Sequence, residues 1–165
     1  TIVRSEQLME KTSREDEFVR NYEMAERYNI TSPIPTGAKL QSLNMIRPTI
    51  GIITQHFNPT MEHHGVDIAA NPQESVVAVM DGTVVLSTYT SGYGYILCLS
   101  HPGGLMSIYK HCESLLKQQG DKVKQGDVIA LVSGSRTVYL SNPHLHFELW
   151  YEGQPIDPEK YILFQ

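Results

Sequence analysis

Two histidines that alternate with apolar residues are the first candidates for chemistry in this sequence. In the segment Asn142-Pro-His-Leu-His-Phe-Glu-Leu-Trp150, His144 and His146 flank Leu145. Successive side chains of a β-strand point to opposite faces, so both imidazoles would share one face while Leu145 and Phe147 share the other. A polar face needed only for solubility would more simply use Lys, Thr or Glu, so the pattern favours a metal or catalytic site.

A second cluster, His63-His-Gly-Val-Asp67, places a histidine and a carboxylate four residues apart. Gly65 argues against a helix and favours a turn or the start of a strand. Imidazole and carboxylate are ligand types that zinc accepts, and three protein ligands with an open position describe a catalytic zinc site. The spacing alone is a weak signal, but together with the His-x-His pattern it predicts a metal site. His64 is the alternative ligand if the register is displaced by one residue.

The remaining histidines carry less information by themselves. His111 follows an apolar run that ends in Tyr109, and a histidine in such a position is more often a surface or loop residue than a catalyst. We interpret Tyr109 as a packing residue that fixes His111. His56 and His101 are interpreted as ordinary surface or loop residues.

The composition is that of an ordinary globular protein. The 165 residues suffice for one catalytic domain with an appendage. Apolar residues make up 41% and charged residues 19%, which excludes a mostly disordered or collagen-like chain. The formal net charge of -5 provides no basic surface for phosphates, so nucleic acid is not an expected partner. Because the sequence begins at Thr1, a signal peptide or a membrane anchor could lie upstream of it.

Residues 1–39 are expected to form an N-terminal helix and a linker. Helix formers predominate from Ser5 to Asn29, where apolar residues recur at helical spacing. Two prolines and a glycine in residues 31–37 then end the helix. This region could tether the main domain, inhibit it by covering its cleft, or only pack on its back. The main domain is predicted to span residues 40–165.

Short apolar or alternating runs fill the main domain. The predicted strands are residues 50–53, 76–80, 83–86, 95–99, 106–109, 128–132 and 144–150. Turn signals such as Asp81-Gly82 and Gly126-Asp127 separate these runs. Many short strands with no long helical stretch between them favour antiparallel pairing. We therefore expect a mainly β fold, a barrel- or sandwich-like antiparallel β-sheet domain with an N-terminal α-helix.

Six motifs, taken in order, resemble those of the lysostaphin-type, or LytM-like, zinc endopeptidases. They lie at residues 63–70, 79–84, 92–95, 108–111, 120–126 and 143–148. The resemblance covers about Ile46 to Ile162 and is highly specific, because all six motifs stand in the family's order. It implies a zinc-dependent endopeptidase, with one zinc ion per chain, that hydrolyses peptide cross-links of bacterial peptidoglycan.

The resemblance also implies roles for five residues. His63, Asp67 and His146 correspond to the metal ligands, His144 is catalytic, and His111 is its partner. Relatives that only activate other envelope enzymes have usually lost some of these residues. Metal-activated water is the expected nucleophile, and His111 and His144 share the proton work in roles that the sequence does not separate.

Three features near the site leave its details open. Glu148 could orient an imidazole or be a solvated carboxylate at the end of a strand, and it is left outside the predicted site. Residues 57–60 read Phe-Asn-Pro-Thr where Phe-Gly-x-Arg is usual, and residues 138–142 lack the usual small residues. Because both segments border the expected groove, the bond that is cut stays open: a D-alanyl to diaminopimelyl bond, a glycine bridge or another short peptide.

Two other functions compete with the endopeptidase. One is a zinc-retaining, non-catalytic module that binds the cell wall or activates an amidase. The other is a carrier barrel like biotinyl and lipoyl domains, a reading that leaves the histidines unexplained. By resemblance, the protein acts in the cell envelope, periplasmic or extracellular, on the peptide stems or cross-bridges of peptidoglycan. Cys98 and Cys112 could form a disulfide there if their geometry allowed, and the oligomeric state is open.

Overall fold

The computed structural model of the protein describes residue 40, residues 42–134 and residues 142–165. The predicted N-terminal helix and linker lie outside the described residues, so they stay predictions, as does the domain boundary. No helix within the described ranges is long and apolar enough to cross a membrane.

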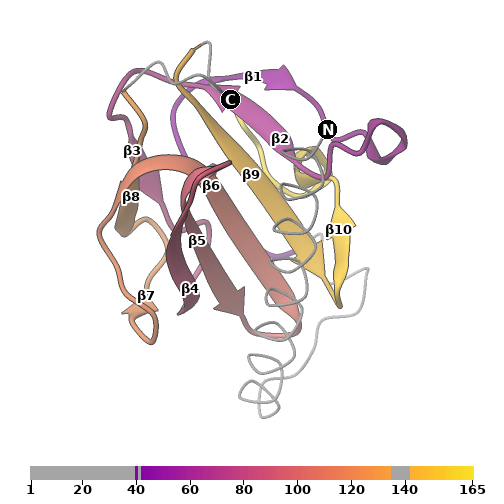
Figure 1. The fold of residues 1–165 in the computed structure, drawn as a ribbon. Coiled ribbons are helices and arrows are strands. Elements are labelled where there is room, and N and C mark those ends of the chain that lie inside the picture. Colours follow the sequence, from indigo (N-terminus) through magenta and orange to yellow (C-terminus); the bar gives the residue numbers. More distant parts are fainter. Residues whose placement is uncertain (1–39, 41, 135–141) are drawn as a thin grey trace, which may run out of the picture.

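The described residues form antiparallel β-structure with two short 3-10 helices, η1 (Pro59–Met61) and η2 (Pro158–Lys160). The strands are β1 (Ile52–Gln55), β2 (Val66–Ala69), β3 (Ser75–Val77), β4 (Gly82–Thr90), β5 (Gly94–His101), β6 (Leu105–Leu115), β7 (Lys122–Val123), β8 (Val128–Val132), β9 (His144–Tyr151) and β10 (Gln154–Ile156). The main path of pairing is β1-β2-β9-β6-β5-β4-β7, with β10 on β9, and with β8 joining β3 to β6. Figure 1 shows β9 running through the middle of the sheet between β2 and β6.

The mainly β fold class is confirmed, in the form of an open sheet. Within the described residues no pairing joins β1 to β7. Each of the seven predicted runs overlaps a strand, whereas β2, β7 and β10 were not predicted. These three strands are only two to four residues long, and β2 and β10 contain Asp67 and Pro155, which interrupt an apolar pattern.

The sheet has two differently used faces. Leu145, Phe147 and Leu149 of β9 are buried in the main hydrophobic core. On the alternate positions of the same strand stand the polar residues His144, His146 and Glu148, followed by Trp150. Trp150 packs against a second, smaller apolar cluster made of Ile96, Cys98, Met106 and Ile108. The alternation predicted from the sequence therefore gathers the candidate chemical groups on the face opposite the main core.

The two cysteines are free and buried. Cys98 belongs to the second cluster and Cys112 to the main core. Cys98 lies opposite Ile108, and Cys112 lies opposite Tyr95, so the thiols are separated both along and across the sheet. The disulfide that the sequence left open is therefore not formed.

His101 is buried, and its interpretation as a surface residue is wrong. Its Nδ1–H donates to the Asp81 carbonyl at 2.7 Å, and Nε2 lies 2.7 Å from Ser107 Oγ. Ser107 Oγ is 2.9 Å from the Tyr109 hydroxyl, which accepts from the Val79 N–H at 3.2 Å. Burial lowers the pKa of His101 to about 4, so the neutral imidazole forms part of a hydrogen-bonded chain inside the domain.

Candidate metal centre

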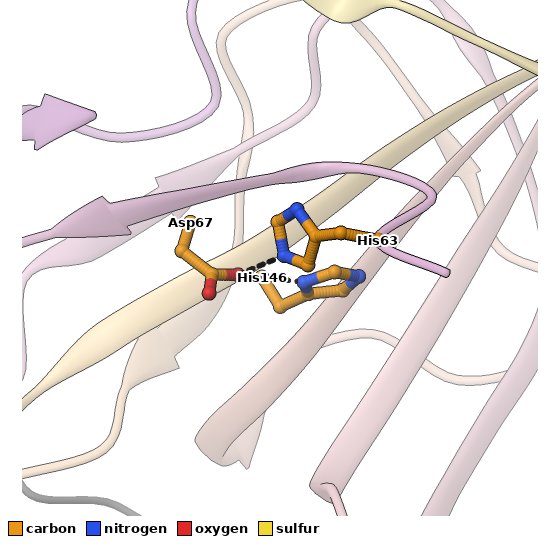
Figure 2. Close-up of side chains that lie close together, drawn as sticks. All are labelled: His63, Asp67 and His146. Carbon is orange, nitrogen blue, oxygen red and sulfur yellow. Dashed lines mark hydrogen bonds and ion pairs between the residues drawn. The ribbon is translucent and has the colours of Figure 1, made fainter. Parts of the chain in front are cut away.

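The side chains of His63, Asp67 and His146 converge, and their candidate ligand atoms all lie within 4.8 Å of one another. Asp67 Oδ1 is 2.6 Å from His146 Nδ1 and 3.3 Å from His63 Nε2. Figure 2 shows the Asp67 carboxylate directed at both rings. Of the described residues, this group includes His63 and leaves out His64, the alternative ligand.

Two adjacent strands and one tight turn position these side chains. Asp67 of β2 lies directly opposite His146 of β9 in the antiparallel register. His63 precedes β2, and its backbone N–H donates to the Asn58 carbonyl at 3.0 Å while its own carbonyl accepts from the Asn58 N–H at 2.8 Å. A Cβ added at Gly65 would lie 2.3 Å from the Phe147 carbonyl oxygen, so this position needs glycine for the turn to approach β9.

His63 has the hydrogen bonding of a metal ligand. Its Nδ1–H donates to the His56 carbonyl at 2.8 Å, which leaves a lone pair on Nε2. Nε2 is buried and has no hydrogen-bond partner among the described residues, although the Asp67 carboxylate is 3.3 Å away. A lone pair facing a carboxylate is unfavourable unless a cation lies between them. Such a nitrogen, backed by a carbonyl acceptor, is the arrangement found around metal-bound histidines.

The distances from Asp67 to the two histidine nitrogens can be compared with those of a zinc site. Ligand atoms about 2.1 Å from a tetrahedral zinc ion are roughly 3.4 Å apart. The His63–Asp67 separation of 3.3 Å matches this value. The His146–Asp67 hydrogen bond of 2.6 Å would have to lengthen by about 0.8 Å to admit the ion, within the reach of a side-chain rotation.

His146 lies between two carboxylates. Asp67 Oδ1 accepts from Nδ1 at 2.6 Å, and Glu148 Oε2 accepts from Nε2 at 2.7 Å. Burial opposes a positive charge on this ring, but these two hydrogen bonds outweigh it and raise the pKa of His146. Burial likewise opposes ionisation of Asp67, yet the bond from His146 lowers its pKa below the ordinary value. Positive charge is therefore favoured at this point, as a metal site requires.

A β-bulge aims His111 at the same site. From Leu97 to Tyr95, β5 advances two residues, whereas the facing stretch of β6 advances three, from Tyr109 to Cys112. Tyr109 and Cys112 both enter the main core, so Lys110 and His111 are left to the other face. His111 adopts a left-handed backbone with φ of 66°, and its N–H donates to the Tyr93 carbonyl at 2.8 Å.

His111 and His144 lie next to each other beside the candidate ligands. Their ring centroids are 4.9 Å apart, and the His111 ring is 6.2 Å from that of His146. Burial and the neighbouring His144 and His146 lower the pKa of His111 to about 3. The His144 Nδ1–H donates to the Asn142 carbonyl at 3.0 Å, which leaves Nε2 as a proton acceptor. The structure thus brings together all five residues that the sequence singled out.

Two charged residues lie behind His146, one of which the sequence named only as a possible partner of an imidazole and one of which it did not single out. Glu148 was left outside the site, but it is only 5% exposed and contacts His146 directly. Lys110 forms an ion pair of 3.1 Å with Glu148. The signal for Glu148 was its position two residues after His146, on the same strand face. Lys110 gave no comparable signal, because its contact depends on the bulge in β6.

Comparisons with known proteins show what the chain is similar to. A family model described as "Peptidase family M23" matches residues 61–158, more than half of the chain. Murein hydrolase activator NlpD of Salmonella dublin is 32% identical over 117 residues, which cover 70% of this chain and 30% of that protein.

Two solved structures are similar to this chain in fold. A zinc-containing peptidase from Vibrio cholerae aligns with a TM-score of 0.62 and 28% identity, over 70% of this chain and 39% of that chain. The antimicrobial peptidase lysostaphin from Staphylococcus simulans aligns with a TM-score of 0.58 and 26% identity, over 66% and 48% of the two chains. The present chain spans less than half of the length of each of these three proteins.

Proposed function

Because the chain belongs to peptidase family M23, we propose that it is a zinc-dependent endopeptidase that hydrolyses peptide cross-links of bacterial peptidoglycan. The resemblance to LytM-like peptidases, inferred from the motifs, is confirmed at the level of the family. The site of action would be the cell envelope, and the substrate the peptide stems or cross-bridges of the wall.

One observation carries the proposal: a three-residue metal site adjoins two further imidazoles. The converging atoms of His63, Asp67 and His146 support binding of one zinc ion, and three protein ligands are the number that catalytic zinc sites use. His111 and His144 lie beside them, with ring centroids 4.9 Å apart. A structural zinc site would need neither of these histidines, whereas peptide hydrolysis needs groups that accept and donate protons.

When bound, zinc would supply a Lewis acid that polarises the scissile carbonyl and increases the acidity of a water molecule. His144 has its Nδ1–H committed to Asn142, so its Nε2 would accept the proton of the attacking water. His111 would donate an N–H to the carbonyl oxygen as this atom gains negative charge. The proton held by His144 would then pass to the leaving amine.

A non-catalytic activator is the second candidate, because the 32% identical relative from Salmonella dublin is named a murein hydrolase activator. In this case the zinc site would stabilise a binding surface, and His111 and His144 would be dispensable. Retention of both imidazoles beside the site favours the peptidase.

Mass spectrometry of digested peptidoglycan would separate the two functions. Purified protein loaded with zinc is incubated with peptidoglycan, and the released fragments are sequenced. New amino and carboxyl ends are expected, and they should disappear after chelation and in His111→Asn, whose side chain tolerates a left-handed backbone. Stoichiometric zinc binding without fragments, together with faster digestion by an added amidase, would establish the activator instead.

A further inference from the structure

A polar cluster behind His146 consists of the buried Glu148 and the partly buried Lys110 and Trp150. Glu148 Oε2 accepts from His146 Nε2 at 2.7 Å and from Lys110 Nζ at 3.1 Å. Its other oxygen, Oε1, accepts from the Trp150 indole N–H at 2.8 Å. One carboxylate therefore accepts hydrogen bonds from three donors on two strands.

Removing these charged groups from water costs free energy, so their presence here calls for an explanation. The side chains of Lys110 and Glu148 are 21% and 7% exposed. Ile108 and Met106 lie across from Glu148 and Trp150 in the register of β6 and β9, and both belong to the second apolar cluster. A well-packed apolar pair is often as stable as a buried ion pair. Stability alone therefore does not account for charged residues here.

The geometry points to a positioning role. When His146 is neutral, an Nε2–H held by the Glu148 carboxylate leaves the lone pair on Nδ1, the atom that faces Asp67. A half-turn of the ring about Cβ–Cγ would exchange Nδ1 with Cδ2 and Nε2 with Cε1, and both hydrogen bonds would be lost. The acceptor at Glu148 thus fixes the tautomer and the orientation of His146 at once.

Lys110 and Trp150 hold the hydrogen-bond acceptor, the Glu148 carboxylate, in place. The Trp150 N–H holds Oε1, so the carboxylate cannot rotate away from His146. Lys110 lies directly opposite His146 in the register, and its ammonium group is 4.7 Å from the centre of the Tyr93 ring. We infer that Lys110, Glu148 and Trp150 hold His146 with Nδ1 directed at the metal. This inference rests on the metal site of the proposed function.

Two variants test the inference. Glu148→Gln can accept from His146 only by turning its amide NH2 toward the Trp150 N–H, so one donor opposes another. The double variant Lys110→Met with Glu148→Leu removes the acceptor but leaves no unpaired charge, so it is expected to fold. Ile108→Val is the matched control, since it loosens the same face of the sheet without touching His146.

The first measurement is zinc affinity, by competition with a chelator, on the full chain. Loss of an outer partner of a metal-bound histidine typically weakens affinity 10- to 100-fold. We expect about a 10-fold loss for Glu148→Gln, a larger loss for the double variant and no loss for Ile108→Val. The second measurement is the proton NMR signal of the His146 Nε2–H in zinc-loaded, ¹⁵N-histidine-labelled protein. It should exchange slowly with water in the wild type and rapidly in the double variant.

The possible failures are distinguishable. If wild-type protein binds no zinc, or if Asp67→Asn binds it equally well, the proposed metal site is wrong and the positioning role fails with it. If the wild type binds one equivalent but the folded double variant keeps the same affinity and the same slow N–H exchange, only the positioning role is overturned.

Discussion

Replacing Lys110 with methionine should destabilise the protein because it leaves the buried carboxylate of Glu148 without its counter-charge. At 3.1 Å the two charges attract by about 5 kcal/mol for an effective dielectric constant of 20. Removing one partner of a buried pair typically costs about 3–5 kcal/mol. His146 and Trp150 still donate to Glu148 in this variant, so we expect the lower end, about 3 kcal/mol at neutral pH.

Urea unfolding of chelator-treated protein, followed by far-ultraviolet circular dichroism, measures this loss without a contribution from zinc. The double variant Lys110→Met with Glu148→Leu should recover most of it, because no charge is left unpaired. Lys122→Met, at an exposed position of β7, is the matched control and should change little. A Lys110→Met protein within 1 kcal/mol of the wild type, or a double variant less stable than the single one, would refute the reasoning.

Three further predictions concern backbone fit and protonation. Gly65→Ala should lower the free energy of unfolding by about 1–3 kcal/mol and weaken zinc binding, because its Cβ would lie 2.3 Å from a backbone oxygen. In the same unfolding and zinc-titration assays, Gly92→Ala should change neither property, because its Cβ would meet no atom within 4 Å. His111→Gly should be about 1 kcal/mol more stable to urea than His111→Ala, since φ is 66° there, while neither variant cleaves peptidoglycan. For His101, the pKa is about 4 in the folded protein against 6.5 when unfolded, so only the unfolded chain gains a proton as the pH falls through this interval. The contribution of His101 to the free energy of unfolding should therefore fall by about 3 kcal/mol from pH 6.5 to 4. Urea unfolding of His101→Gln should show a shallower drop with pH than the wild type, and an equal drop would contradict the assignment.

The sequence predicted the site well where the direction of a side chain follows from alternation along a strand. Alternation along β9 puts His144 and His146 on one face, and the structure has them there. Gly65 indicated a turn or strand entry, and the structure adds the reason, a close approach to Phe147 that excludes a Cβ. The second ligand strand, β2, was not among the predicted runs, because four residues that include an aspartate carry too little apolar pattern to distinguish a strand from the turn that Gly65 also allowed.

Residues whose direction depends on tertiary contacts could not be predicted in this way. Strict alternation from Tyr109 would send the His111 side chain into the core. The β-bulge instead places Cys112 in the core and turns the His111 side chain toward the site. The interpretation of His101 failed for a related reason. Its burial depends on Ser107 and Asp81, which are brought to it by strand pairing rather than by sequence spacing.

Metal titration of hydrolysis tests the central claim most directly. Metal-free protein is mixed with peptidoglycan and increasing zinc, and the release of new amino groups is followed, with Asp67→Asn as the control. The release rate should rise linearly, level off at one zinc per chain and stay at background in the variant. Full zinc occupancy without amino-group release, or release that chelation leaves unchanged, would contradict a zinc-dependent peptidase.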